Sequence, residues 1–347
     1  MDIIVLLQQA VLNHASDIFV VAGLPVSYRA NGRICREKEE KLMPPQTKEC
    51  VEELYKLAGG RDIRVLEEKG DDDFSFAVPG LSRFRVSAYK QRGALSAVIR
   101  VITFELPEPN EIGIPDPVMS FYNLSKGLVL VTGPAGSGKS TTLACLVDKI
   151  NHSMEKHIIT LEDPIEYLHR HDRSIVNQRE IGSDSNSYGA ALRAALREDP
   201  DVILVGEMRD LETISTALTA AETGHLVLST LHTIGADKTI DRNIDVFPPN
   251  QQQQVRIQLA SVLECIISQQ LIRREDGRGR VAALEVLFAN TAIRNMIREN
   301  KTYQIISTMQ TGKRQGMQTM DDAIYELFLR GDISADSAVS YAQKLGR

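Results

Sequence analysis

The chain has 347 residues, of which 43% are hydrophobic and 25% are charged, and this composition is typical of a globular protein. Its length exceeds what one hydrophobic core usually supports, so two domains are expected. The formal net charge of -6 argues against a broad basic surface for nucleic acid, and no apolar run approaches the roughly 20 residues of a membrane span.

Two further features favour a cytoplasmic protein. An acid, Asp2, stands where a secretory signal would carry basic residues. The cysteines Cys35, Cys50, Cys145 and Cys265 are too far apart to form local zinc-binding pairs, so we expect free thiols in a reducing compartment.

The N-terminal part predicts a small α+β domain over residues 1–103. Apolar residues recur at helical spacing in the first 14 residues, and a second helix is expected at 47–58. Strands are expected at residues 16–21, 25–35, 74–78, 83–91 and 95–103. The second of these runs contains Asn31-Gly32, a two-residue hairpin signal.

Residues 104–118 predict a semi-rigid linker. They contain Pro107, Pro109, Pro115 and Pro117, and proline fixes the backbone torsion φ without donating a hydrogen bond to a sheet or helix. The linker therefore separates two domains.

From residue 119 to 347, strand-like runs alternate with helical patterns, which indicates βαβ units and a mostly parallel sheet. Strands are expected at residues 127–131, 157–161, 202–205, 226–230 and 280–288. Helices are expected at residues 188–198, 211–222 and 251–268, and further helices should fill the C-terminal part. The predicted fold class is therefore α/β, preceded by the smaller α+β domain.

A candidate phosphate loop follows the strand at 127–131. Its residues, Gly133, Pro134, Ala135, Gly136, Ser137, Gly138, Lys139 and Ser140, fit the pattern G-x-x-x-x-G-K-[ST]. Glycines let backbone N–H groups curl around an anion, Lys139 would meet the β- and γ-phosphates of ATP, and Ser140 would bind Mg²⁺. Thr141 continues the same site into the helix. A structural glycine turn is the alternative, but the flanking strand and helix favour a P-loop ATPase.

Two carboxylates are candidates for the reaction chemistry. Glu207 ends the apolar strand 202–205 like the carboxylate of a Walker B strand, which serves Mg²⁺, often through water. Because Gly206 stands where an aspartate is usual, the general base is expected elsewhere. Glu166, which follows the strand 157–161, is the candidate, and a solvated acidic turn is the alternative.

Two histidines, His225 and His232, bracket the strand that begins at 226. A polar side chain at the end of such a strand can hydrogen-bond a γ-phosphate and report its presence. On the residues alone, a core histidine with satisfied hydrogen bonds is the favoured interpretation of either.

Together these segments resemble the retraction ATPases of type IV pili (PilT type), the twitching-motility branch of the secretion ATPase superfamily. The resemblance covers nearly the whole chain and is densest between residues 176 and 225. Residues 292–299, AIRNMIRE, match the retraction signature AIRNLIRE with one conservative change. Arg294 in this signature is expected to transmit motion rather than perform chemistry.

The resemblance implies a RecA-like ATPase domain preceded by a PAS-like α+β domain, with ATP and Mg²⁺ as cofactors. It places Glu166 in the Asp box at the position of the catalytic base. Glu207 falls at the end of the Walker B box, and His225 and His232 fall in the His box.

The resemblance also implies a homohexamer in which Arg85 and Arg100 act on the nucleotide of a neighbouring subunit. Solvated strand residues are the alternative, since this is the usual fate of arginine on an open sheet face. The ring would sit at the cytoplasmic face of the inner membrane and withdraw a pilus through a platform protein of that membrane. No nucleic-acid partner is expected.

The chain departs from the family pattern at Phe19, Ile234, Gly235 and Asn243, which lie outside the phosphate chemistry and bear on subunit packing or rate. Three alternatives remain open. A pilus-extension or secretion ATPase of the superfamily would carry a further N-terminal domain and a four-cysteine zinc module, and neither is seen. A RecA-like nucleic-acid motor is disfavoured by the acidic balance. A nucleotide-binding regulator without turnover is the third.

Overall fold

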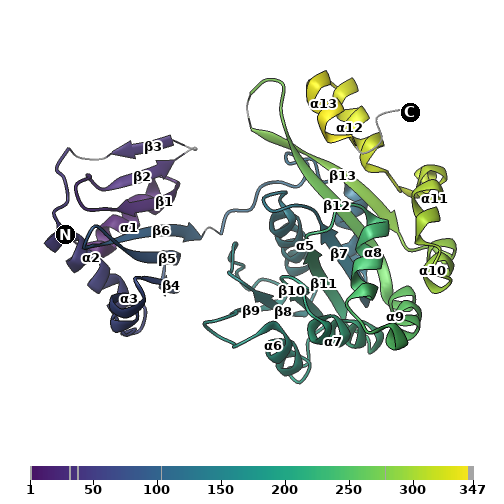
Figure 1. The fold of residues 1–347 in the computed structure, drawn as a ribbon, viewed down its shortest axis with the longest axis horizontal. Coiled ribbons are helices and arrows are strands. Elements are labelled where there is room, and N and C mark those ends of the chain that lie inside the picture. Colours follow the sequence, from purple (N-terminus) through teal and green to yellow (C-terminus); the bar gives the residue numbers. More distant parts are fainter. Residues whose placement is uncertain (1, 31–32, 37–38, 103, 278, 343–347) are drawn as a thin grey trace. The chain divides into compact units, whose positions relative to one another are not determined.

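The computed structural model describes residues 2–30, 33–36, 39–102, 104–277 and 279–342 (Figure 1). The chain divides into two compact units. The first comprises the residues up to Glu105 together with Glu166–Leu168, and the second comprises Leu106–Ile165 and the residues from His169 onward.

The first unit is a six-stranded antiparallel sheet in the order β3-β2-β1-β6-β5-β4. Its strands are β1 (Ala15–Val20), β2 (Ser27–Ala30), β3 (Arg33–Arg36), β4 (Asp71–Val78), β5 (Ser82–Gln91) and β6 (Ala94–Ile102). Its helices are α1 (Ile3–Leu12), α2 (Pro44–Leu57) and α3 (Arg64–Lys69). Alternate strand residues such as Ile18, Val86 and Ile99 are buried in one cluster with all three helices, so the helices cover a single face of the sheet. This arrangement confirms the predicted α+β domain.

The second unit is built on a seven-stranded sheet in the order β13-β12-β7-β11-β10-β8-β9, in which only β13 is antiparallel to its neighbour. Its strands are β7 (Gly127–Thr132), β8 (His157–Glu162), β9 (Ile175–Glu180), β10 (Val202–Val205), β11 (Leu226–Leu231), β12 (Leu263–Arg273) and β13 (Arg280–Phe288). Its helices are α4 (Asp116–Met119), α5 (Lys139–Ser153), α6 (Tyr188–Ala195), α7 (Leu211–Glu222), α8 (Ala236–Asp245), α9 (Pro249–Val262), α10 (Thr291–Arg298), α11 (Ile305–Thr311), α12 (Met320–Leu329) and α13 (Ala335–Tyr341). Short 3-10 turns occur at Ser120–Asn123, Thr302–Gln304 and Lys313–Gln315.

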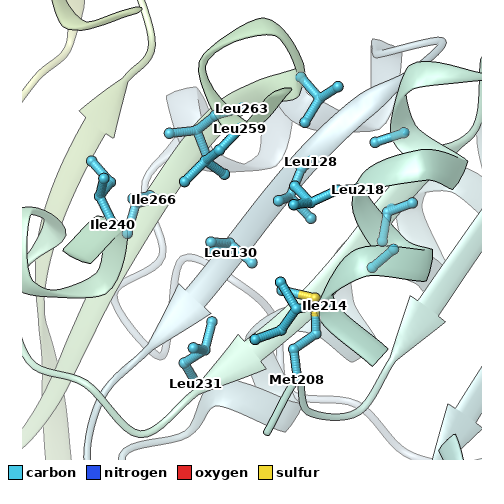
Figure 2. Packing of buried hydrophobic residues seen from close by; sticks show 14 of the residues in the cluster. Leu128, Leu130, Met208, Ile214, Leu218, Leu231, Ile240, Leu259, Leu263 and Ile266 are labelled. Carbon is cyan, nitrogen blue, oxygen red and sulfur yellow. The ribbon is translucent and has the colours of Figure 1, made fainter. Parts of the chain in front are cut away.

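The inner strand β7 is buried on both faces of this sheet. Leu128 and Leu130 pack in a cluster with residues of α7, α8 and α9 (Figure 2), whereas Val129 and Val131 pack in another cluster with residues of α5. Each leucine removed from water contributes about 1.5–3 kcal/mol. A parallel sheet with helices on both faces confirms the predicted α/β class.

One prediction was wrong. Residues 251–268 do not form a single helix, because α9 ends at Val262 and β12 begins directly at Leu263. Leu263, Cys265, Ile266 and Ile267 are all buried, since β12 lies between β7 and β13 with both faces covered. A strand without a polar face lacks the two-residue alternation that separates it from a helix in sequence.

The proline-rich segment is partly incorporated into the second unit. Ile114 and Val118 are each 1% exposed and belong to the cluster that also contains β7. The unit boundary accordingly falls between Glu105 and Leu106, inside the predicted linker of residues 104–118. The predicted turn at Asn31-Gly32 lies outside the described residues, although β2 and β3 are paired as a hairpin requires.

A buried carboxylate joins two helices of the second unit. Glu285 of β13 accepts hydrogen bonds from the backbone N–H groups of Ala236 at 2.7 Å and Met320 at 3.3 Å, the first residues of α8 and α12. Burial raises the pKa of Glu285, and these two hydrogen bonds oppose that rise.

Within the described part of the chain, no helix is long and apolar enough to span a bilayer.

Candidate nucleotide site

The predicted nucleotide elements meet at one edge of the seven-stranded sheet. β7, β11, β10 and β8 are adjacent and parallel, so the segments that follow them emerge together. These segments carry the phosphate loop after β7, His232 after β11, Glu207 after β10 and Asp163 after β8. The topology therefore gathers a cation, a histidine and carboxylates at this edge.

The phosphate loop leads directly into α5. Lys139 is the first residue of this helix, and Gly138 before it has φ 88°. The Lys139 ammonium group is buried and donates to the carbonyl oxygens of Gly133 and Pro134, each at 3.0 Å. The Ser137 hydroxyl is buried and makes no hydrogen bond within the described residues. A polar cradle that contains a buried cation and an unpartnered hydroxyl fits a phosphate group.

Two glycines allow this loop to approach β12. A Cβ atom at Gly133 would lie 2.2 Å from the carbonyl oxygen of Gln269, and one at Gly138 would lie 2.8 Å from its Nε2 atom. The side chain of Gln269 in turn accepts a hydrogen bond from Thr142 of α5 at 2.7 Å. Sequence reasoning missed Gln269, because it lies just beyond the segment that was predicted to be a helix.

Glu207 is surrounded by polar partners. Its side chain is 13% exposed, and its Oε2 atom lies 2.6 Å from Nε of Arg209 and 3.3 Å from Nε2 of His232. A cavity of about 310 Å³ is lined by these three residues and by Met208 and Thr230, among others. Sequence reasoning missed Arg209, although its spacing two residues beyond Glu207 was visible.

The two predicted histidines lie at opposite ends of β11. His232 follows the strand at the edge that carries Glu207. His225 precedes the strand, and its Nδ1 atom lies 2.9 Å from the carbonyl oxygen of Ala220. A strand of six residues separates the two by roughly 20 Å, so only His232 belongs to the Glu207 cluster of this chain. A role for His225 stays a prediction.

A tyrosine hydroxyl also faces this edge. Burial raises the pKa of Tyr188, and the nearby carboxylates of Glu207, Asp163 and Glu162 raise it further. The hydroxyl is therefore neutral at physiological pH and remains a hydrogen-bond donor. Sequence reasoning did not single out Tyr188, since its approach to the strand end depends on where α6 lies.

Arg85 and Arg100 lie side by side on the first unit. They are paired across β5 and β6, and Asp17 faces Arg100 from β1. The Asp17 carboxylate is buried and lies 3.1 Å from Nε of Arg100 and 3.5 Å from Nε of Arg29. The Arg29 guanidinium also lies 5.4 Å from the ring centre of Phe19, one of the departures from the family pattern. Action of these arginines on a nucleotide stays a prediction.

The remaining predicted base, Glu166, is exposed and belongs to the first unit. Its role therefore also stays a prediction.

Two of the residues that depart from the family pattern make hydrogen bonds. Gly235 donates its N–H to the Ser268 hydroxyl at 3.1 Å, and the buried amide of Asn243 donates to the Thr239 carbonyl at 2.8 Å. Both contacts are internal to the second unit.

The signature segment 292–299 is anchored through Arg294 of α10. Its Nη1 atom donates to the carbonyl oxygens of Ala260 and Ser261 in the last turn of α9, at 2.8 and 2.9 Å. Its Nε atom donates to Ala289 at 2.8 Å, and its Nη2 atom donates to Glu264 at 2.9 Å. Arg294 thus joins the end of α9 to the start of β12 and α10.

A family model described as "Type II/IV secretion system protein" matches residues 2–338. The chain is 47% identical over 338 residues to the type IV pilus retraction ATPase PilT of Pseudomonas aeruginosa, covering 97% of each chain. It is 50% identical over 280 residues to a twitching motility protein of Neisseria gonorrhoeae, covering 81% of this chain and 75% of the relative. A crystal structure of the pilus retraction motor PilT with bound ADP matches with a TM-score of 0.90 and 49% identity, covering 99% of this chain and 98% of the other. The chain therefore belongs to the type II/IV secretion system protein family, among the relatives of the pilus retraction ATPase PilT.

Proposed function

We propose that this protein is a hexameric motor ATPase that couples ATP hydrolysis to retraction of type IV pili. The observation that carries the proposal is a complete phosphate loop at the same sheet edge as Glu207, in a chain 47% identical over its near-full length to a pilus retraction ATPase. The alternative motors of other classes share the loop but not this extent of identity.

The residues divide the chemistry among them. Lys139 balances the charge of the β- and γ-phosphates, and Ser140 and Glu207 would hold Mg²⁺, Glu207 partly through water. When bound, Mg²⁺ neutralises charge that develops on the phosphate oxygens. Glu166 accepts a proton from the attacking water. The buried Lys139 ammonium and the unpartnered Ser137 hydroxyl support this assignment.

Arg209 and His232 both contact the Oε2 atom of Glu207. We infer that His232 also reports the γ-phosphate, because it follows the strand next to β7. Substitution of His232 should then change turnover more than the affinity for ADP.

The nucleotide site is completed across the ring. Arg85 and Arg100 reach the phosphates of the neighbouring subunit, and such an arginine can contribute roughly 10³–10⁵ in rate. The ring acts at the cytoplasmic face of the inner membrane, on a platform protein of the pilus machinery, and uses no nucleic acid. Hydrolysis moves the domains as rigid bodies about the linker.

Turnover tests the chemistry. Lys139→Ala should lower steady-state phosphate release by orders of magnitude, because the loop loses its cation, while the circular dichroism spectrum stays that of the wild type. Glu166→Gln should bind Mg-ATP and fail to cleave it, since Gln cannot accept the proton. Full activity in Glu166→Gln would show that the base lies elsewhere.

Mixed rings test the arginines. The Arg85→Ala, Arg100→Ala double variant and the Lys139→Ala variant should each be inactive, and mixing them should restore part of the turnover. Restoration is expected because some interfaces in a mixed ring pair an intact phosphate loop with intact arginines. No restoration in rings shown to be mixed would count against action in trans.

Gene deletion tests the direction of pilus movement. Loss of a retraction motor should leave cells with more surface pili and no twitching. A deletion strain without pili would indicate a pilus-extension ATPase instead.

A further inference from the structure

Gly206 stands where a Walker B strand usually has aspartate, and the surrounding atoms leave little room for a side chain at this position. Its φ lies outside the left-handed region, so its backbone conformation does not require glycine. A Cβ atom built on Gly206 would lie 2.8 Å from the hydroxyl oxygen of Tyr188 and 3.1 Å from the carbonyl oxygen of Leu161. The volume that an aspartate side chain would enter at this strand end is therefore partly filled by a phenol oxygen.

The backbone around Tyr188 fixes where this hydroxyl lies. Tyr188 is the first residue of α6, and Ser187 before it caps the helix by accepting the N–H of Ala190 at 3.2 Å. The Tyr188 ring packs against the hydrophobic cluster of the second unit, while its hydroxyl reaches the strand end. The β10 strand end is held in turn by Gly206, whose N–H donates to Leu161 at 2.7 Å.

Carboxylates face the hydroxyl from two neighbouring strands. Glu162 ends β8 and Asp163 follows it, and Glu207 follows β10. Within the part of the chain that the structure describes, the Tyr188 hydroxyl makes no hydrogen bond to protein. A neutral phenol that lies among carboxylates and has no protein partner has one donor and two lone pairs available to bound water.

We propose that Tyr188 is a positioning residue for the Mg-nucleotide complex, and that its hydroxyl takes the place of the carboxylate that Gly206 lacks. A Walker B aspartate usually serves Mg²⁺ through water and accepts hydrogen bonds from water bound to the metal. The Tyr188 oxygen can accept the same kind of bond while its O–H stays available to donate to a second water. This inference rests on the proposed nucleotide site formed by Lys139 and Glu207.

The hydroxyl is neutral, and this limits how much its loss can change nucleotide affinity. A hydrogen bond between neutral partners contributes only modestly to binding, so its loss should change the affinity for Mg-ADP by about two- to tenfold. The effect should appear only with Mg²⁺, because the hydroxyl acts through metal-bound water and not on the phosphates. Tyr188→Phe removes this one oxygen and leaves the packed ring in place.

The test measures the dissociation constant of ADP by calorimetry, with Mg²⁺ and with EDTA. In Tyr188→Phe, the gain in affinity on adding Mg²⁺ should be about two- to tenfold smaller than in the wild type, with the EDTA value unchanged. Tyr122→Phe, a half-buried tyrosine elsewhere in the second unit, is the matched control and should behave as the wild type. An unchanged gain, or an equal loss of affinity in both conditions, would overturn the proposal.

A second set of variants tests whether the Tyr188 oxygen and a carboxylate at position 206 compete for the same space, and Gly206→Asp alone keeps the wild-type tyrosine. Gly206→Asp alone should bind Mg-ADP poorly, because the new side chain meets the Tyr188 hydroxyl. Gly206→Asp combined with Tyr188→Phe should regain dependence on Mg²⁺, since a carboxylate then replaces the phenol oxygen. A double variant no better than Gly206→Asp would also overturn the proposal. Lys139→Ala separates a failure of the Tyr188 proposal from a failure of the proposed nucleotide site. If Lys139→Ala binds ADP as the wild type does, the nucleotide site itself is misassigned.

Discussion

Substitution of Arg294 shows whether this residue of the signature segment 292–299 stabilises the fold or instead transmits motion to a partner. In Arg294→Ala, three backbone carbonyls at the end of α9 and the start of α10 lose their donor, and Glu264 loses its ion pair. Isolated bonds from a charged group are worth about 1.5–3 kcal/mol each, but water can reach this site, since the two side chains are 20% and 31% exposed. We therefore expect a loss of about 2–4 kcal/mol in total.

Arg298 on the same helix is the matched control. It is exposed and its guanidinium contacts Asn295, three residues away, at 2.5 Å. Such a local surface contact is worth about 0–0.5 kcal/mol. Arg298→Ala should consequently leave stability unchanged, while it removes a charge of the same type from the same helix.

Hydrogen exchange measures the difference locally. Amides at the α9–β12 junction, residues 256–264, should exchange roughly 30- to 700-fold faster in Arg294→Ala than in the wild type or Arg298→Ala. The melting temperature of the second unit should fall by roughly 5–15 °C. Equal exchange in the two variants would refute the reasoning. Arg294 would then act on a partner and not on the fold.

Two further predictions concern the two units separately. Gly133→Ala should abolish ADP binding measured by calorimetry, because the added Cβ meets the backbone oxygen of Gln269 at 2.2 Å and the loop must move. In the first unit, burial by itself would raise the pKa of Asp72, but hydrogen bonds from Arg61 and Tyr55 outweigh it and hold that pKa below its usual range. Because this pKa is lower in the folded state, the ionised carboxylate stabilises the fold above about pH 4, and this stability is lost as pH falls further. Asp72→Asn should therefore lower the free energy of unfolding by about 3 kcal/mol at pH 7, and this difference from the wild type should shrink in urea titrations below pH 4. A deficit independent of pH would contradict this reading of Asp72.

The parts of the fold that could be predicted from sequence are those with a local signature. The phosphate loop was visible because its glycines, Lys139 and Ser140 occur at fixed spacing between a strand and a helix. The strands β7, β8, β10 and β11 were visible as short apolar runs between helical patterns. β12 was hidden, because burial on both faces removes the alternation that marks a strand.

The parts of the site that sequence could not reveal depend on contacts between distant segments. Gln269 supports the phosphate loop from a strand more than a hundred positions away. Tyr188 reaches Gly206 only because α6 begins beside the end of β10. In sequence, Arg294 is part of a segment that resembles the retraction signature and was expected to transmit motion. Its carbonyl partners on α9 are known only from the fold.

The central claim is that hydrolysis at the Lys139 site drives retraction. The most direct measurement is the number of surface pili and the twitching zone of a deletion strain that carries either the wild-type gene or Lys139→Ala at equal protein level. The wild type should restore normal pilus number and twitching, and Lys139→Ala should leave abundant pili and no twitching. Normal twitching with Lys139→Ala, or cells without pili in its presence, would contradict the account.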